Sequence, residues 1–126
     1  MDKKIHILMV EDDAFFRKLY RDQLTSAGFE FSEAITGVEG LHKIMAEHPD
    51  LVLLDLMLPQ KNGFDVLAEM RHNETTKNIP VIILSNLGQE SDIKEGLDLG
   101  AQDYLVKTSV RLSDVIKKIN AVLNKD

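Results

Sequence analysis

The stretch "DLVLLDLMLP" at residues 50–59 places a carboxylate, Asp55, within a run of apolar side chains. A short and continuous apolar run is typical of a strand that is covered on both faces, as in a parallel sheet. An ionised carboxylate in apolar surroundings is costly unless a cation or hydrogen-bond donors compensate for its lost hydration. We therefore expect the charge of Asp55 to find its partners in other parts of the sequence.

Further strands are predicted on both sides of this stretch. Most are continuous apolar runs like the one before Asp55, and one weaker segment has the composition of an edge strand. The predicted strands are "IHILMV" (5–10), "EFSEA" (30–34, the edge), "LVLLD" (51–55), "VIILS" (81–85) and "YLV" (104–106).

Helical patterns separate these strands. One helix, from Glu90 to Leu99, has few apolar side chains and Gly96 in its interior, so we expect it to be the most loosely packed. The alternation of strands and helices predicts an α/β protein with a doubly wound parallel sheet and helices on both faces. The expected helices run from Phe16 to Ala27 before Gly28, from a capping box of Thr36 and Glu39 to Pro49, from Phe64 to Met70 after Gly63, from Glu90 to Leu99, and from Leu112 to Leu123.

The composition narrows the class of protein. The length of 126 residues suits one domain, and the absence of cysteine excludes disulfides and thiolate metal sites. The net charge of −6 argues against direct binding to nucleic acid, which usually requires a basic face. Because no apolar run approaches the roughly 20 residues that span a bilayer, we expect no membrane insertion and a cytoplasmic location.

Polar side chains gather at the ends of the predicted strands. Glu11 and Asp12 end the first strand, Asp55 the third and Ser85 the fourth, and the fifth runs into Lys107. In a doubly wound sheet the carboxyl ends of the strands share one edge, where ligands bind. The carboxylates there would repel one another, and a hard cation with oxygen ligands, Mg²⁺ before Zn²⁺, would relieve this repulsion.

Single residues at this edge also have ordinary explanations. Asp13 is expected to cap the following helix. One of Phe15 and Phe16 should belong to the core, with Phe15 as the exposed one. The four histidines lack the spacing of metal ligands and are read as ordinary strand or surface residues: His6, His42, His48 and His72.

Taken together, the residues at the strand ends have the parts needed to accept a phosphoryl group. Asp55 would be the nucleophile, Mg²⁺ the Lewis acid, and Lys107 and Ser85 the donors to the phosphoryl oxygens. The formal charges of the three acids balance those of Mg²⁺ and the lysine. No further catalytic apparatus is evident in the sequence.

Four separated motifs resemble the receiver domain of two-component response regulators, of which the single-domain chemotaxis regulator is the stand-alone member. The resemblance extends from about Lys4 to about Leu123. It implies a flavodoxin-like sheet in the order 2-1-3-4-5 with five helices, and one receiver domain over residues 1–126 without an output domain. The matching motifs are "VEDD" (10–13), "LLDLMLPQKNG" (53–63), "ILS" (83–85) and "GAQDYLVK" (100–107), the last of which ends in the lysine.

The resemblance also implies the metal ligands. Asp55 would be the phosphoacceptor and a ligand of Mg²⁺, and Asp12 would bind the ion directly. Glu11 would act mainly through metal-bound water, and Met57 would contribute its backbone carbonyl.

The switch residues are implied in the same way. Lys107 would pair with Asp55 and then with the phosphoryl oxygens, and Ser85 would donate its hydroxyl to the phosphoryl group. Tyr104 would then turn inward, and the face formed by the helix at 90–99 and the last strand would change shape.

The family resemblance implies a switch and not a turnover enzyme. A sensor histidine kinase or a histidine phosphotransfer protein would supply the phosphoryl group, and a downstream protein would read the result. One alternative is a degenerate receiver that serves as a constitutive interaction module. Another is a Mg²⁺-dependent phosphatase, which the sequence disfavours because Met57 stands where such enzymes place a second aspartate.

The sequence departs from the family at three places near the site. Thr108 follows Lys107 where the family usually has a proline after a cis bond, so the cis or trans state of this peptide is left open. Asn86 is bulkier than the residue common at its position. Met57 places an apolar side chain beside the acceptor, and we expect it to change the rate at which the phosphoryl group is hydrolysed.

Overall fold

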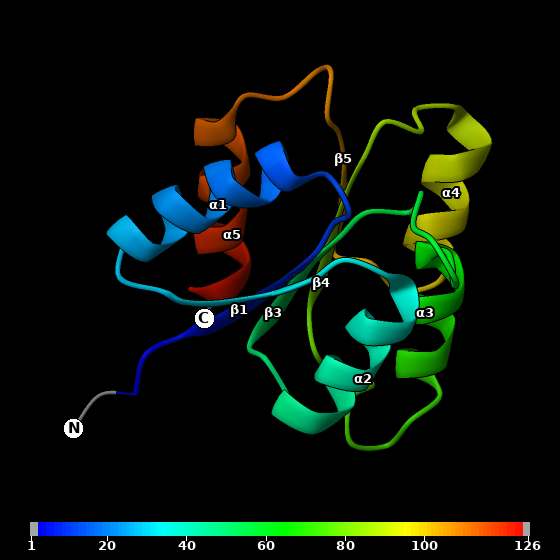
Figure 1. Cartoon of the computed structure of the whole chain (residues 1–126). Coiled ribbons are helices and arrows are strands. Elements are labelled where there is room, and N and C mark those ends of the chain that lie inside the picture. The colour runs from blue at the N-terminus through cyan, green and yellow to red at the C-terminus, as the bar shows by residue number, and fades with distance from the viewer. Residues whose placement is uncertain (1–2, 125–126) are drawn as a thin grey trace.

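Five parallel strands form one sheet in the order β2-β1-β3-β4-β5 within residues 3–124, which the computed structural model describes (Figure 1). This topology confirms the fold class expected from the sequence. The elements are, in chain order, β1 (His6–Val10), α1 (Ala14–Ser26), β2 (Glu30–Ala34), α2 (Gly37–Glu47), β3 (Leu51–Leu54), α3 (Gly63–Arg71), β4 (Val81–Ser85), α4 (Glu90–Asp98), β5 (Asp103–Val106) and α5 (Leu112–Leu123).

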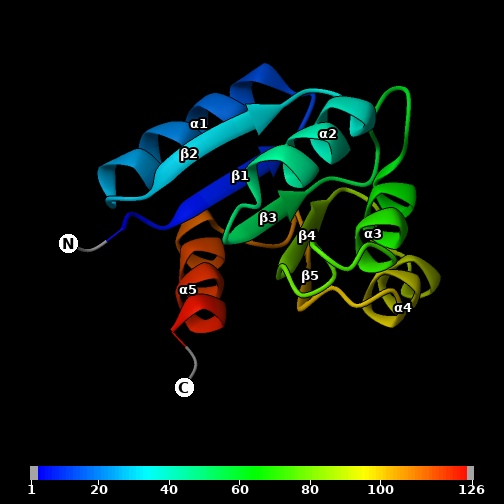
Figure 2. The ribbon, with the colours of Figure 1, turned by 90° about the horizontal axis from the view of Figure 1, so that it is seen from below.

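Helices cover both faces of the sheet. Figure 2 shows α1 and α5 on one face and α2, α3 and α4 on the other. Alternate residues of β1 enter different cores: Ile7 and Met9 pack with α1 and α5, and Leu8 and Val10 pack with the other three helices. Because both faces of the strand are buried, its sequence is continuously apolar instead of alternating.

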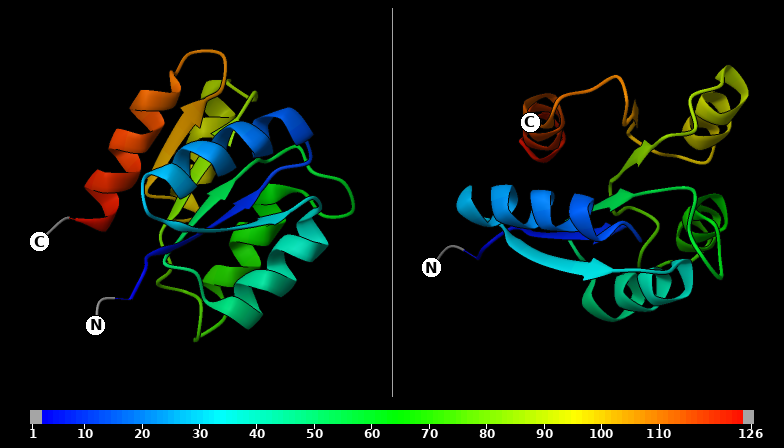
Figure 3. Two further views of the ribbon diagram at one scale, coloured as in Figure 1. Left: turned by 60° about the vertical axis from the view of Figure 1, so that its left-hand side comes forward. Right: turned by 45° about the horizontal axis from the view of Figure 1, so that its top comes forward.

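The strands all run in the same direction (Figure 3), so their carboxyl ends share one edge. At this edge the chain turns from β1 into α1. Asp13 caps α1 as expected, because its side chain accepts a hydrogen bond of 3.1 Å from the backbone N–H of Phe16. Gly28, with φ of +96°, follows the end of this helix in a conformation that favours glycine.

The capping box predicted for α2 is only half formed. Thr36 accepts a bond of 3.0 Å from the backbone N–H of Glu39, as predicted. The Glu39 carboxylate, however, accepts its bond of 2.8 Å from the N–H of Ile35 and not from that of Thr36. Ile35 lies just beyond the end of β2, so its N–H also needs a partner, and the carboxylate reaches one residue further back than the capping box requires.

The helix α4 buries a single residue, Gly96, fewer than each of the other helices, in keeping with the sparse packing expected of it. The residue before it, Gln89, makes no side-chain capping bond. A β-carbon on Gly96 would lie 2.6 Å from Ile83 Cδ1 and 3.0 Å from the ring of Tyr104. The glycine that weakens the helix therefore also lets it approach β4 and β5.

Two further expectations concern the backbone and the membrane. No peptide bond in the described part of the chain is cis, so the bond between Lys107 and Thr108 is trans. Within residues 3–124, none of the helices has both the length and the apolar character needed to cross a bilayer.

Candidate metal and phosphoacceptor site

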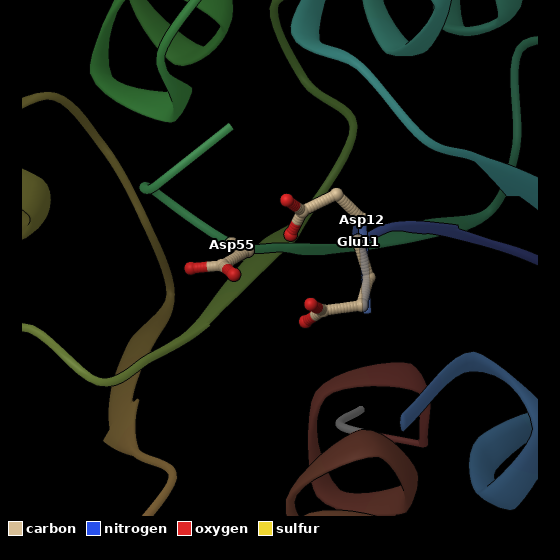
Figure 4. Close-up of side chains that lie close together, drawn as sticks. All are labelled: Glu11, Asp12 and Asp55. Atoms are coloured by element: carbon tan, nitrogen blue, oxygen red, sulfur yellow. The ribbon is translucent and has the colours of Figure 1, made fainter. Parts of the chain in front are cut away.

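Three carboxylates come together at the carboxyl edge of the sheet. Glu11 and Asp12 follow β1, and Asp55 follows the neighbouring β3, whose Leu54 pairs with Val10. One carboxylate oxygen from each acid lies within 4.8 Å of those of the other two, and Figure 4 shows the three groups pointing into the same space. The register of two adjacent parallel strands thus brings together residues that are more than 40 positions apart.

The charge of Asp55 is compensated by the two backbone N–H groups that follow it and by Lys107, far away in the sequence. Its side chain is almost fully buried, with 5% of the residue exposed. The oxygen Oδ1 accepts hydrogen bonds from the backbone N–H groups of Leu56 at 2.7 Å and Met57 at 3.2 Å. The oxygen Oδ2 accepts a bond of 3.1 Å from Lys107 Nζ. These contacts explain how a carboxylate can follow a wholly apolar strand.

Lys107 links two of the acids. Its Nζ lies 2.6 Å from Glu11 Oε1 and 3.1 Å from Asp55 Oδ2, and its side chain is 9% exposed. Burial works against the charged lysine, but the bond to Glu11 and the charge of Asp55 outweigh it and raise the pKa of Lys107. The lysine is therefore charged at neutral pH.

Glu11 is the most deeply buried of the three acids, with 1% of the residue exposed. Burial raises the pKa of Glu11, the ion pair with Lys107 opposes this change, and the charge of Asp55 adds to it. Its Oε2 accepts a bond of 3.1 Å from the backbone N–H of Asp13. Its Oε1, although close to Lys107, lacks a hydrogen bond of good geometry among the described residues.

The donor set fits a hard divalent cation. All three acids offer oxygen ligands, and their charge of −3 exceeds the single positive charge of Lys107 by two. Glu11 Oε1 is buried beside Lys107 but has no hydrogen bond of good geometry among the described residues, so its negative charge is incompletely compensated. Asp12 is exposed, so it can meet an ion that keeps part of its hydration shell.

Ser85 and Tyr104 both hold the backbone of Leu87, in the loop between β4 and α4. The buried Ser85 Oγ accepts a bond of 3.3 Å from the N–H of Leu87, and the Tyr104 hydroxyl donates a bond of 2.6 Å to its carbonyl. Tyr104 is already turned inward, since only 8% of it is exposed. Burial, with the charges of Asp92 and Asp55, raises the pKa of Tyr104 to about 12.

Sequence reasoning missed two residues at this site. Leu87 takes part through its backbone, which a side-chain motif cannot reveal. Phe16, which was considered only as a core residue, has its ring centroid 4.6 Å from Lys107 Nζ and stacks on Tyr20 with centroids 5.8 Å apart. Phe15 is 71% exposed, as expected of the outer member of the pair.

The other residues considered from the sequence lie elsewhere or contribute differently. His6 sits at the start of β1, where its Nε2 is 2.8 Å from Ser32 Oγ, and His48 ends α2 in a left-handed conformation with φ of 48°. Met57 lies two residues beyond Asp55, and its side chain points largely into solvent with 56% exposed. Among the described residues, the histidines do not join the acidic cluster.

The fold and the site define a class: a doubly wound parallel α/β domain with an acidic pocket and one buried lysine at the carboxyl edge of its sheet. Residues 7–120 match the family model described as the response regulator receiver domain. The chain belongs to this family, which confirms the resemblance seen in the sequence motifs.

Individual relatives agree with this assignment. The DNA-binding dual master transcriptional regulator RpaA of Synechocystis is 37% identical over 94% of this chain and 49% of its own length. The CheY-like receiver domain protein of Methanospirillum hungatei superposes with a TM-score of 0.90 at 28% identity, covering 97% of this chain and 95% of that one. CheY from the CheX-CheY-BeF3-Mg complex of Borrelia burgdorferi gives a TM-score of 0.87 at 31% identity, covering 96% and 90%. The chain spans about half the length of the curated relatives it matches.

Proposed function

We propose that this receiver domain is a phosphorylation-controlled switch that accepts a phosphoryl group on Asp55 from a sensor histidine kinase or a histidine phosphotransfer protein. The observation that carries the proposal is the position of Asp55, which shares one space with Glu11 and Asp12 and is paired with Lys107. A structural ion pair would need one acid for one lysine. Three acids in one pocket with one lysine leave negative charge that a further cation would neutralise.

The transfer would use groups that are already in place. An Asp55 oxygen forms the new O–P bond while the N–P bond of the donor phosphohistidine breaks, and the electron pair of that bond stays with the imidazole nitrogen. Lys107, now 3.1 Å from Asp55 Oδ2, offsets the charge that the phosphoryl oxygens bring in. The Ser85 hydroxyl uses its oxygen to accept from Leu87, so its hydrogen is free to be donated to a phosphoryl oxygen.

The residues that would hold Mg²⁺ are Asp12, Asp55 and the backbone carbonyl of Met57 directly, and Glu11 through water. The ion, when bound, supplies positive charge beside the incoming phosphoryl oxygens. The apolar Met57 side chain next to Asp55 would alter how water reaches the acyl phosphate, so its effect on the hydrolysis rate stays a prediction.

The signal would leave the site through the loop at Leu87. A phosphoryl group adds about two negative charges and three acceptor oxygens, which attract the Ser85 hydroxyl. Because Ser85 and Tyr104 both hold Leu87, a movement of the serine is transmitted to the tyrosine and to α4. A complete shift of such an equilibrium, from about 1:99 to 99:1, requires a bias of about 5.5 kcal/mol.

The position of the Tyr104 ring is one part of this conformational equilibrium. Its ring is buried and its hydroxyl donates to the Leu87 carbonyl, which is the inward position that the resemblance implies for the phosphorylated form. Phosphorylation would act by increasing the population of conformations in which the ring is turned inward. The face formed by α4 and β5 would then present its active form to a downstream protein.

Intact-mass measurement after incubation with Mg²⁺ and a small phosphodonor tests the proposal. The protein should gain one phosphoryl group, and the Asp55→Asn variant should gain none. A protein that stays unmodified with several donors would instead act as a constitutive interaction module. Steady turnover of a phosphomonoester substrate would identify a phosphatase.

The partners and surroundings of the chain follow from this proposal and stay predictions. The net charge of −6 favours a protein target over direct contact with nucleic acid. RpaA is described as DNA-binding, but this chain matches only 49% of its length. The organisation of residues 1–126 as one receiver domain and the cytoplasmic location likewise stay predictions.

A further inference from the structure

The ammonium group of Lys107 has three close neighbours. Two are carboxylates, since Nζ lies 2.6 Å from Glu11 Oε1 and 3.1 Å from Asp55 Oδ2. The third is the ring of Phe16, whose centroid is 4.6 Å from Nζ. This distance is within the range of a cation–π interaction, in which the negative face of the ring attracts the cation.

We propose that Phe16 is a positioning residue for phosphoryl transfer, which holds the Lys107 ammonium beside Asp55 through the face of its ring. The inference rests on the proposed function in so far as Lys107 takes part in that transfer. Phe16 offers no reacting group of its own and acts through the lysine.

A ring suits this position better than a polar group would. A further carboxylate would add negative charge to a site whose three acids already exceed its lysine. A water molecule would hydrate the ammonium and weaken its attraction to Asp55. The ring attracts the cation without adding charge, and it has no directed lone pair that would compete when phosphoryl oxygens take over the donors of the lysine.

The position of the ring is itself fixed by α1. The backbone N–H of Phe16 donates to the capping residue Asp13, which places Phe16 in the first turn of the helix. Its ring then stacks on the ring of the buried Tyr20, with an interplanar angle of 26°. The first turn of α1 therefore positions the aromatic ring beneath the lysine. Two acids of the site, Glu11 and Asp12, precede this same turn.

Phosphorylation by acetyl phosphate in the presence of Mg²⁺ tests the role of the ring, because this small donor does not depend on the docking of a kinase. The variants are Phe16→Leu, which keeps an apolar side chain but removes the π system, and Phe16→Tyr, which keeps the ring. Phe15→Leu is the matched control, because it is the same change one residue away at a ring that is 71% exposed. We expect F16L to be phosphorylated about three- to tenfold more slowly, with F16Y and F15L within about twofold of the parent.

A second measurement reads the lysine directly in the unphosphorylated protein. The Lys107 ammonium protons, observed by ¹⁵N NMR, should exchange with water severalfold faster in F16L and at the parent rate in F16Y. If F16L does not fold, Phe16→Met takes its place in both measurements with the same expectation.

Two results would overturn the inference. One is an F16L variant with parent phosphorylation rate and parent exchange; the other is an F16Y variant as impaired as F16L, which would assign Phe16 to packing alone. If the parent itself accepts no phosphoryl group, the proposed function fails, and the exchange measurement still decides whether Phe16 positions Lys107.

Discussion

The hydroxyl of Tyr104, on β5, donates a hydrogen bond of 2.6 Å to the backbone carbonyl of Leu87, in the loop between β4 and α4. The same loop residue donates its N–H to Ser85 Oγ at 3.3 Å. The proposed phosphoryl-binding serine and the proposed switch tyrosine are therefore both bonded to the backbone of the same residue, Leu87. This arrangement couples them through the backbone of Leu87.

Replacing Tyr104 with phenylalanine should break this coupling with little change in packing. We expect Y104F to lose about 0.5–1.5 kcal/mol of unfolding free energy, because one hydrogen bond is removed. Amide hydrogen exchange at residues 86–90 should become faster, whereas exchange in β1 should not. Tyr20→Phe is the matched control, since among the described residues no hydrogen bond joins the Tyr20 hydroxyl to the protein. Equal exchange at residues 86–90 in Y104F and Y20F would contradict the role of the Leu87 bond.

Gly96 should not tolerate a side chain although it lies in a helix. Alanine at this position would favour the helix by about 1 kcal/mol, but the new β-carbon would lie 2.6 Å from Ile83 Cδ1 and 3.0 Å from the Tyr104 ring. Overpacking of this kind typically costs about 1–3 kcal/mol, so the clash should outweigh the gain in propensity. Chemical denaturation of G96A should show a net loss of stability, while Glu95→Ala, at the exposed neighbouring position, should be neutral or stabilising. A stabilised G96A would show that α4 can move away from the sheet freely.

Added Mg²⁺ should raise the melting temperature through binding to the folded state. Stabilisation by a ligand at 100 times its Kd is about 2.7 kcal/mol, and chelation with EDTA should remove it. Asp12→Asn should abolish the response while leaving the metal-free protein folded, because Asp12 is exposed and makes no part of the core. Asp22→Asn, an exposed aspartate on α1 that pairs with Lys18, is the control and should keep the full response. If D12N responds to Mg²⁺ like the parent, the ion binds elsewhere.

The raised pKa of Glu11 gives a pH dependence of stability. A carboxyl whose pKa is higher in the folded than in the unfolded state binds more protons when folded, so it favours folding at low pH. This contribution is lost as the pH rises from the ordinary value of 4.5 through the raised one. In EDTA at neutral pH, Glu11→Gln should therefore be more stable than the parent, and the difference should shrink as the solution is acidified. Denaturant titrations at several pH values measure this difference, and a gap that widens on acidification would show that Lys107 holds Glu11 ionised.

Much of the fold followed from local patterns in the sequence. The continuous apolar runs identified the strands because both faces of each are buried, and Asp13 and Gly28 marked the ends of α1 as expected. The capping box at α2 was only half correct, because Glu39 found the N–H of Ile35 within reach after the end of β2. The path of the backbone decides which of two adjacent N–H groups a carboxylate can reach. A sequence pattern does not specify this path.

The sequence by itself determined which polar residues meet. In a parallel sheet, the carboxyl ends of the strands must arrive at the same edge, so the positions of Glu11, Asp12, Asp55, Ser85 and Lys107 at the ends of their strands were sufficient. Only the tertiary structure decided what surrounds them: the ring of Phe16 beneath the lysine, the backbone of Leu87 between serine and tyrosine, and the inward Tyr104. These contacts depend on the angles at which α1 and the loop before α4 pack on the sheet. Such angles result from the packing of the whole core and not from any one segment.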